Sequence, residues 1–256
     1  MTLDAVVFDW AGTLVDFGSL APIRAFTAAF ERAGVPVTTV EARAPMGSAK
    51  RDHIAAVLAM PAVAARWEAA HGAPPTTADG DRIYAAFLPL NEGLAADGGV
   101  PIPGAVEAVA FLRVAGIPIG STTGYTRSIM ARLLPAAEAH GLSLDCVVTA
   151  DDVQSGRPAP DGVLKNLKTF GIEPSRAVVK VDDTPVGILE GKNAGCRTVG
   201  VALSGNLAGL CEDDLADLSP AAIADLRASA TAALTEAGAD HVIDTVRDLP
   251  PLLGAV

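Results

Sequence analysis

The 256-residue sequence has little cysteine and lysine, and it has no long apolar run. Its three cysteines, Cys146, Cys196 and Cys211, are far apart and form no CxxC pair, which argues against a disulfide framework or a cysteine-rich zinc site. No apolar run approaches the roughly 18 residues of a membrane-spanning helix, and the chain begins without the basic and apolar segments of a signal peptide. We therefore expect a cytoplasmic protein with reduced thiols and no membrane partner.

Positive charge is also scarce. The chain carries 19 lysines and arginines against 30 acidic residues, which gives a net charge of −11. An acidic surface disfavours nucleic acid and anionic membranes as partners. A locally positive site on such a protein can still bind a small anion, so a small-molecule substrate fits the composition. Because half of the residues are hydrophobic, the chain can bury a core in one large or two modest domains.

Six short, β-branched apolar runs of strand length are spaced along the chain. They are 5–8, 117–119, 146–148, 177–181, 198–201 and 241–243. Alanine-rich helical stretches separate most of them, for example 104–115 and 161–170. Continuous apolar strands that alternate with helices are typical of a parallel sheet buried on both faces. We predict an α/β fold with a Rossmann-like, doubly wound parallel sheet.

One segment departs from this alternation. From about Gly18 to Gly98 the sequence has no convincing strand. Helices are predicted over 21–33, 39–60, 62–71 and 79–94. We therefore predict an all-helical cap domain at 18–98, inserted into a core made of 1–17 and 99–256. A further helix is expected at 218–237.

Polar residues follow the predicted strands where a ligand of a parallel sheet would bind. Asp9 directly follows the first strand and is a candidate nucleophile. Thr123 and Gly124 follow the second strand, where a hydroxyl and backbone N–H groups at a helix start can hold an anion. Arg157 follows the third strand and offers a permanent charge to phosphate oxygens.

Two adjacent acids, Asp182 and Asp183, follow the fourth strand. Oxygen ligands from these acids and from Asp9 suit a magnesium ion. Taken one at a time, each of these strand ends also has a structural explanation: a loop aspartate, a helix cap or a solvated turn. Taken together, they provide the nucleophile, hydroxyl, cation and acids of a phosphate site.

The run Asp9-Trp10-Ala11-Gly12-Thr13 resembles the DxxGT signature of the haloacid dehalogenase superfamily. Thr123, Arg157 and the pair Asp182-Asp183 fall where its second, third and fourth motifs are expected. The resemblance implies that Asp9 attacks phosphorus to form an aspartyl-phosphate. It also implies a Mg²⁺ ion bound by Asp9, by the backbone carbonyl of Ala11 and by the fourth-motif acids, with Asp183 favoured over Asp182.

Two positions depart from the superfamily pattern. Most of its phosphatases carry a second aspartate where this chain has Ala11, and a methyl group cannot transfer protons to a leaving alcohol. The fourth motif often ends in an acid where this chain has Gly187. We expect Asp182 to compensate at the metal, directly or through water.

The use of lysine is the third distinctive feature. The chain has 14 arginines and five lysines, and Lys50 is the only lysine in the first 164 residues. A deprotonated lysine can form an imine with a carbonyl, which arginine cannot. On the predicted helix, Met46, Lys50 and His53 share one face.

The combination resembles the phosphonoacetaldehyde hydrolase family, or phosphonatases, of the same superfamily. The matching stretches are 8–13, Met46-Gly47 with Lys50 and Asp52-His53, 120–127, and 156–158. The resemblance implies hydrolysis of the carbon–phosphorus bond of a small phosphonate through a Lys50 imine. It also suggests a homodimer.

In that chemistry the departing atom is carbon, which accounts for Ala11. His53 is the candidate proton shuttle, and Tyr125 is a candidate to orient substrate or water. Backbone N–H groups near Trp10, Ala11 and Gly124 are expected to hold the phosphoryl group, and Met46 is expected to contact the substrate.

Two alternatives remain open at this level. A capped phosphatase or phosphomutase acting on a phosphate ester predicts an aspartate at position 11. A non-catalytic homologue that binds phosphate is compatible with both Ala11 and Gly187.

Overall fold

The computed structural model describes residues 3–95 and 97–254. Its centre is a six-stranded, all-parallel sheet with the strand order β3-β2-β1-β4-β5-β6. The strands are β1 (Ala5–Phe8), β2 (Ile119–Thr122), β3 (Cys146–Val148), β4 (Val178–Asp182), β5 (Arg197–Val201) and β6 (His241–Ile243). The predicted α/β class with a parallel sheet is confirmed.

Strand β1 lies at the centre of the sheet and is buried on both faces. Val6 pairs with Ile119 of β2 on one side and with Val179 of β4 on the other. Alternate residues of β1 belong to different hydrophobic clusters: Val6 and Phe8 join the larger one, whereas Ala5 and Val7 join the smaller. The apolar run at 5–8 thus explains why this segment occupies the middle of a covered sheet.

Helices cover both faces of the sheet. From residue 97 onward the described chain forms the helices α6 (Ala105–Val114), α7 (Arg127–Ala139), α8 (Asp161–Phe170), α9 (Pro185–Asn193), α10 (Glu212–Ala216), α11 (Pro220–Glu236) and α12 (Leu249–Gly254), with short 3₁₀ turns η1 (Asp97–Gly99), η2 (Ala150–Asp152) and η3 (Val246–Asp248). Val163 and Leu167 of α8 pack with Ala5 and Val7, whereas Val109 of α6 lies in the cluster of the opposite face. None of the helices within the described ranges has both the length and the apolar character to cross a bilayer.

Strand β2 extends further than the sequence suggests. The predicted run ends before the polar residues Ser121 and Thr122, yet both are buried members of the strand. Their hydroxyls have partners inside the core, since Ser121 accepts from the Trp10 indole and Thr122 donates to Glu190. Buried polar groups are tolerated in a strand when tertiary contacts complete their hydrogen bonds.

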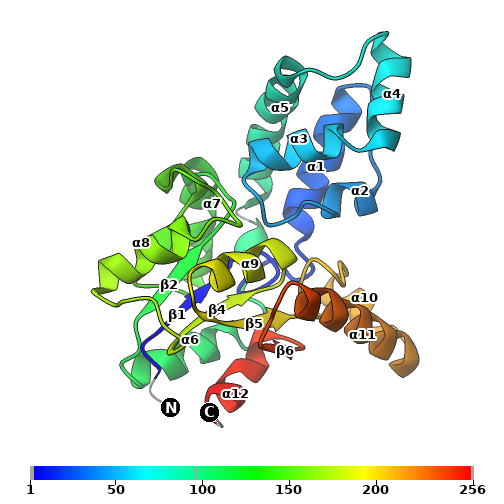
Figure 1. Cartoon of the computed structure of the whole chain (residues 1–256). Helices are drawn as coiled ribbons and strands as arrows, with labels where there is room; N and C mark the ends of the chain where they lie inside the picture. Colours follow the sequence, from blue (N-terminus) through cyan, green and yellow to red (C-terminus); the bar gives the residue numbers. More distant parts are fainter. Residues whose placement is uncertain (1–2, 96, 255–256) are drawn as a thin grey trace.

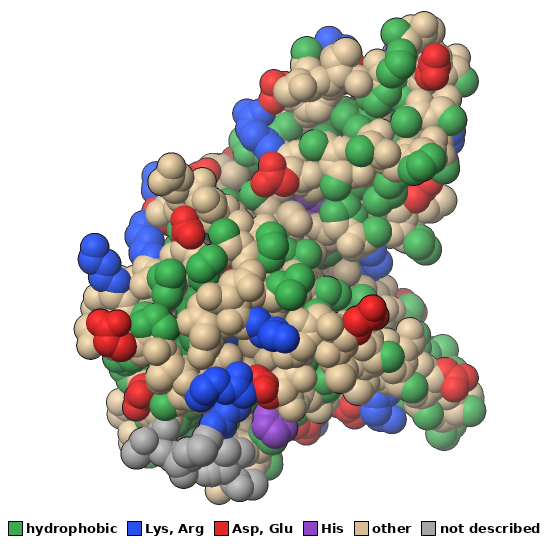
Figure 2. Space-filling view, in the orientation of Figure 1, with side chains coloured by type: hydrophobic (Ala, Val, Ile, Leu, Met, Phe, Trp, Pro, Cys, Tyr) green, Lys and Arg blue, Asp and Glu red, His purple; other side chains and the backbone are tan. Residues whose placement is uncertain are grey.

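Between β1 and η1 the chain forms five helices and no strand among its described residues. These are α1 (Leu20–Arg32), α2 (Thr39–Arg43), α3 (Lys50–Leu58), α4 (Pro61–His71) and α5 (Thr77–Ala95). Figure 1 shows them gathered as a helical bundle beside the sheet and its covering helices. Figure 2 shows that the molecular surface is hollowed between this bundle and the region of α11. The domain limits of 18 and 98 stay a prediction.

The single helix predicted over 39–60 is wrong. The structure has two helices, α2 and α3, separated by a turn at 44–49. Pro45 cannot donate a backbone hydrogen bond, and Gly47 has φ +96°, a conformation that side-chain-bearing residues rarely adopt. A Cβ on Gly47 would also lie 2.5 Å from Thr184 Oγ1. Met46 therefore lies in the turn, and Lys50 is the first residue of α3.

Candidate active site

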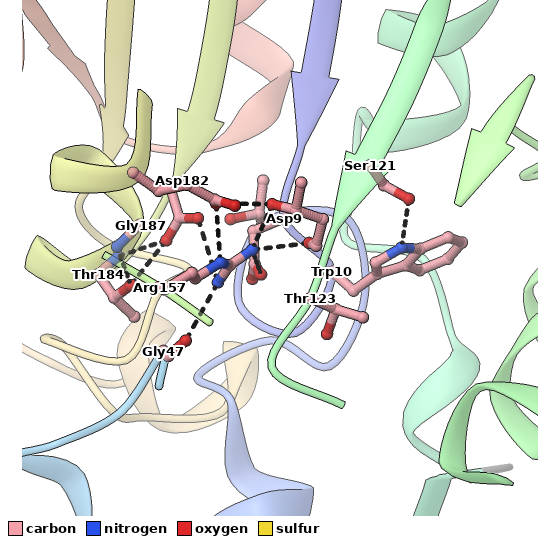
Figure 3. A network of polar contacts seen from close by, with 12 residues as sticks. Asp9, Trp10, Gly47, Ser121, Thr123, Arg157, Asp182, Thr184 and Gly187 are labelled. Atoms are coloured by element: carbon pink, nitrogen blue, oxygen red, sulfur yellow. Dashed lines mark hydrogen bonds and ion pairs between the residues drawn. The ribbon is translucent and has the colours of Figure 1, made fainter. Parts of the chain in front are cut away.

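Asp9 stands at the carboxyl end of the central strand. Its backbone N–H donates to the carbonyl of Val181 on β4 at 2.9 Å, so the sheet pairing continues to this residue. Only 6% of the residue is exposed. This position places the Asp9 carboxylate between the ends of β2 and β4, where the loops carrying the other predicted site residues converge (Figure 3).

The Arg157 side chain is 5% exposed and lies between the carboxylates of Asp9 and Asp182 (Figure 3). Its guanidinium is 2.8 Å from Asp9 Oδ1, 3.5 Å from Asp182 Oδ2 and 2.9 Å from Glu190 Oε2. Burial by itself would lower the pKa of Arg157, but the three surrounding carboxylates outweigh it and raise the pKa. Arg157 thus stays cationic beside the candidate nucleophile, as binding of an anionic group requires.

A second buried basic residue at this site, Lys180, was not predicted from the sequence. Its Nζ is fully buried and lies 2.9 Å from Asp182 Oδ2, 3.4 Å from Glu190 Oε2 and 2.8 Å from Thr122 Oγ1. The signal in the sequence was a lysine within the otherwise apolar run 177–181. Glu190 gave no such signal, because an acid on a predicted helix is ordinary. The contacts among Lys180, Glu190 and Thr122 form a buried network. Through it Lys180 fixes the Asp182 carboxylate and Glu190 fixes the Arg157 guanidinium.

Three carboxylates, Asp9, Asp182 and Asp183, meet at the ends of β1 and β4. One oxygen from each lies within 4.8 Å of the others, and all three residues are buried. Burial, followed by repulsion from neighbouring carboxylates, raises the pKa of Asp9 and of Asp183. Burial opposes ionisation of Asp182 as well, but Lys180 and Arg157 hold its pKa low. Buried, mutually repelling carboxylates are a suitable donor set for a hard divalent cation.

Gly187 has a geometric explanation. A Cβ at this position would lie 1.9 Å from Asp182 Oδ2, so the Asp182 carboxylate already fills the space in front of α9. Thr184 fixes that carboxylate, donating its N–H and its hydroxyl to Asp182 Oδ1 at 3.0 and 2.7 Å. An acid at position 187 and Asp182 in this conformation therefore exclude each other.

Asp183 is held differently. Its Oδ2 accepts the backbone N–H of Asn206 at 2.6 Å, and its Oδ1 accepts the Thr13 hydroxyl at 3.4 Å. Gly12 must lack a side chain here, since it has φ +88° and its Cβ would lie 2.2 Å from Asp183 Oδ2. Asn206 is a contact that the sequence did not reveal, because more than 20 residues separate it from the acid it binds.

The remaining predicted phosphate-binding residues also converge here. Thr123, Gly124 and Ala11 line one cavity together with Asp9 and Arg157. The Trp10 side chain is not available to bind phosphate, because its indole N–H donates to Ser121 Oγ at 2.9 Å within the core (Figure 3). Only the backbone N–H of Trp10 is left as a candidate for phosphate binding.

Lys50 reaches this same cavity from the helical bundle. The residue is 4% exposed, and its Nζ lies 3.9 Å from Met46 Sδ, 5.0 Å from the Tyr125 ring centre and 5.5 Å from that of Phe26. Burial lowers the pKa of Lys50 to about 8. About a tenth of the amine is therefore neutral at pH 7, far more than for an ordinary lysine, and the neutral form is the one that attacks a carbonyl.

Two further predicted residues surround this amine. His53 Nε2 lies 2.8 Å from the Ala42 carbonyl, so it carries the proton, and its ring stacks on Phe26. Nδ1 has no hydrogen-bond partner among the described residues. Burial, followed by the charge of Lys50, lowers the pKa of His53 to about 3. Burial raises the pKa of Tyr125 well above 10, so its hydroxyl keeps its proton.

Comparison with known proteins agrees with this geometry. Residues 3–195 match the family model of the haloacid dehalogenase-like hydrolases. The chain is 49% identical over 249 residues to a phosphonoacetaldehyde hydrolase of Paraburkholderia phytofirmans, covering 97% of this chain and 93% of that protein. It is 47% identical over 255 residues to a phosphonoacetaldehyde hydrolase of Bordetella pertussis, covering 99% and 92%.

The fold is also shared with solved structures of hydrolases. The crystal structure of a phosphonoacetaldehyde hydrolase-like protein from Oleispira antarctica superposes with a TM-score of 0.97 at 40% identity, covering 100% of this chain and 92% of that one. A hydrolase from Pseudomonas syringae shares the fold, with a TM-score of 0.74 at 19% identity over 99% of both chains. This chain therefore belongs to the haloacid dehalogenase-like hydrolases and, within them, to the phosphonoacetaldehyde hydrolase family.

Proposed function

We propose that this enzyme hydrolyses the carbon–phosphorus bond of phosphonoacetaldehyde to acetaldehyde and phosphate. The observation that carries the proposal is the buried amine of Lys50, which lines the same cavity as the carboxylate of Asp9. Hydrolysis of a phosphate ester involves no imine and therefore does not require a neutral amine at that position. The family to which the chain belongs supports the same reaction.

Lys50 supplies the electron sink. Its neutral Nζ attacks the aldehyde carbon to give a carbinolamine. The carbinolamine hydroxyl takes up one proton and leaves as water, which gives a protonated imine. Asp9 then attacks phosphorus, and the electron pair of the carbon–phosphorus bond moves toward the imine nitrogen to leave an enamine. Protonation of the enamine carbon and hydrolysis release acetaldehyde and restore the amine. Water cleaves the aspartyl-phosphate and releases phosphate.

The phosphoryl group is held by positive charge and by oriented donors. Arg157 stands 2.8 Å from the nucleophile and can bind phosphoryl oxygens while it stays buried. The Thr123 hydroxyl and the backbone N–H groups of Trp10, Ala11 and Gly124 are the remaining candidate donors. These neutral groups orient the phosphoryl group without adding further charge to the site.

The carboxylate cluster is the proposed Mg²⁺ site. Asp9, Asp183 and the Ala11 carbonyl are the proposed direct ligands, and Asp182 is the proposed outer partner. Lys180 and Arg157 already compensate the charge of Asp182, whereas no ion pair among the described residues involves Asp183. Bound Mg²⁺ would neutralise charge on the carboxylates and on the phosphoryl group.

Three residues around the amine have supporting roles in this proposal. Neutral His53 can accept a hydrogen bond from water at its unpartnered Nδ1 while its Nε2 stays on the Ala42 carbonyl. Because its pKa is lowered to about 3, its proposed part in proton transfer is to orient that water and not to hold the proton itself. The protonated Tyr125 hydroxyl can orient substrate or water. Met46 packs against the Lys50 amine at 3.9 Å and limits its freedom.

Borohydride trapping tests the proposal. Incubation with phosphonoacetaldehyde and borohydride should add the mass of the reduced substrate or product to Lys50, and Lys50→Arg should show neither adduct nor turnover. Turnover of phosphate esters without an adduct would support a capped phosphatase or phosphomutase instead. Binding of phosphonate without turnover of either substrate class would support a non-catalytic homologue.

The homodimer and the cytoplasmic location remain predictions. Light scattering coupled to size-exclusion chromatography measures the first directly, since a dimer has twice the 25.9 kDa mass of the chain. Fractionation of the source cells tests the second.

A further inference from the structure

Arg43, at the end of α2, is a residue of the helical bundle that makes its hydrogen bonds outside the bundle. Its guanidinium donates to Gly18 O at 2.9 Å, Asn206 Oδ1 at 3.0 Å, Asn206 O at 3.3 Å and Gly209 O at 3.1 Å. Gly18 lies in the linker before α1, and the other two residues lie in the loop after β5. One side chain thus ties together the bundle, its linker and a loop of the core.

That loop also holds Asp183. The backbone N–H of Asn206 donates to Asp183 Oδ2 at 2.6 Å, a charge-assisted hydrogen bond. Asn206 is 4% exposed, and its Nδ2 donates back to the Arg43 carbonyl at 3.3 Å. Gly205 packs so closely that its Cβ would lie 2.5 Å from Asp183 Cβ. Asn206 therefore contacts Arg43 on one side and the proposed metal ligand on the other.

We propose that Arg43 is a positioning residue that couples docking of the helical bundle to the orientation of the Asp183 carboxylate through Asn206. When the bundle lies against the core, the guanidinium fixes the loop, and the loop presents its N–H to Asp183. When the bundle moves away, the loop loses these hydrogen bonds. The site for phosphoryl transfer is then fully ordered only when Lys50 is also in place.

The geometry of the contact favours arginine. The four acceptor oxygens belong to three residues; three of them face Nη1 and the fourth faces Nη2. A guanidinium reaches them from two nitrogens, whereas an ammonium group has only one nitrogen with three donors. Gly209, with φ +67°, lets the group approach its backbone, since a Cβ there would lie 2.8 Å from Arg43 Nε. Substitution by lysine should therefore restore only part of the function.

The inference rests on the proposed function, because it assumes that Asp183 binds Mg²⁺. The first readouts need neither substrate nor turnover. In Arg43→Ala, hydrogen–deuterium exchange of the segment 203–210 in metal-free protein should rise about tenfold or more. The Mg²⁺ dissociation constant, measured by calorimetry, should rise roughly tenfold, as is usual for loss of a group that orients a ligand. In Arg43→Lys, both the exchange rate and the Mg²⁺ dissociation constant should lie between those of the wild type and those of Arg43→Ala.

Turnover gives the third readout. Arg43→Ala should lower kcat about 10–100-fold at saturating substrate, with a smaller change in KM. Asn206→Ala keeps the backbone N–H but loses the side-chain contacts, and the double variant should be no worse than Arg43→Ala alone, because both changes break one connection. Arg82→Ala is the matched control: it removes a bundle arginine whose ion pair, with Asp79, stays within α5.

Unchanged loop exchange and Mg²⁺ affinity in both Arg43 variants would overturn the inference, as would additive effects in the double variant. If Arg43→Ala fails to fold, Arg43→Lys alone decides by the same measurements. If the wild-type protein fails to cleave phosphonoacetaldehyde while the exchange and affinity readouts behave as expected, the proposed function fails and the coupling stands.

Discussion

At the scale of single residues, the site depends on ionisable side chains that are buried, although burial removes the hydration that stabilises their charged forms. Lys50 loses hydration in a pocket bounded by Met46, Phe26 and Tyr125, and its pKa falls to about 8. Arg157 keeps its charge because three carboxylates surround it. Burial thus yields a reactive amine in one place and a fixed cation in another, and the difference lies in the neighbouring charges.

The pH dependence of turnover tests the first of these statements. Because only neutral Lys50 forms the imine, kcat/KM should rise about tenfold per pH unit on the acid side and level off above the Lys50 pKa of about 8. Steady-state kinetics in overlapping buffers measure the profile. An inflection near the ordinary lysine value of about 10.4, or a flat profile below about pH 8, would contradict the low pKa.

The same burial should cost stability. Lys50→Met keeps the side-chain length without the charge, and it should raise the free energy of unfolding near neutral pH by up to about 3 kcal/mol while abolishing turnover. The folded-state pKa is depressed, so the cost is complete below about pH 8 and fades as pH rises toward 10.5.

Urea denaturation at several pH values measures this difference. The gap between wild type and Lys50→Met should be widest below about pH 8 and close at alkaline pH. Lys165→Met is the control, since Lys165 is exposed and pairs with Asp152 at the surface. A Lys50→Met protein that is less stable than wild type at every pH would refute the expectation.

At the scale of elements, the start of α9 sets the geometry of the acids. Thr184 caps the helix by accepting the Gly187 N–H at 3.1 Å, and its hydroxyl donates to Asp182. Pro185 occupies the first turn, where a missing N–H costs nothing. The first turn of α9 therefore packs against the Asp182 carboxylate, and this contact leaves no room for a side chain at position 187.

Gly187→Ala tests this arrangement. Because the new Cβ would lie 1.9 Å from Asp182 Oδ2, the carboxylate or the helix must shift, and we expect a loss of about 1–3 kcal/mol in stability together with a lower kcat. Gly93→Ala in α5 is the matched control: nothing lies within 4 Å of its Cβ position, so it should stabilise by up to about 1 kcal/mol. Thermal denaturation separates the two. Equal effects would argue against a steric conflict at position 187.

At the scale of the whole molecule, the proposed metal site at the three clustered carboxylates predicts that a bound cation stabilises the fold. Mg²⁺ at about 100 times its dissociation constant should add roughly 2.7 kcal/mol to the free energy of unfolding, and a chelator should remove it. The gain should shrink at acid pH, because the raised pKa values of Asp9 and Asp183 let protons compete with the metal.

Differential scanning calorimetry with Mg²⁺ and with chelator measures this effect. Asp183→Asn should abolish most of the magnesium-dependent rise in Tm. Chelated wild-type enzyme should still form the Lys50 imine in the borohydride assay, because that step needs the amine and the aldehyde only. Loss of the adduct on chelation would place the metal in amine activation as well.

The sequence by itself determined much of this protein. The strands at 5–8, 146–148 and 241–243 and the helix at 161–170 have the predicted bounds, because their apolar patterns are local. The convergence of Asp9, Thr123 and Arg157 on one cavity was also predictable, because parallel strands bring their carboxyl ends to one edge of the sheet, whereas the roles of these residues stay predictions.

Only the tertiary structure decided the rest. The hydrogen bonds of Lys180 with Thr122 and of Asn206 with Asp183 join segments 58 and 23 residues apart in the chain. No local pattern encodes such a contact, because its energy comes from burial and hydrogen bonds that exist only after the chain has folded. The low pKa of Lys50 arises in the same way, since it results from burial of the amine, which exists only in the folded chain.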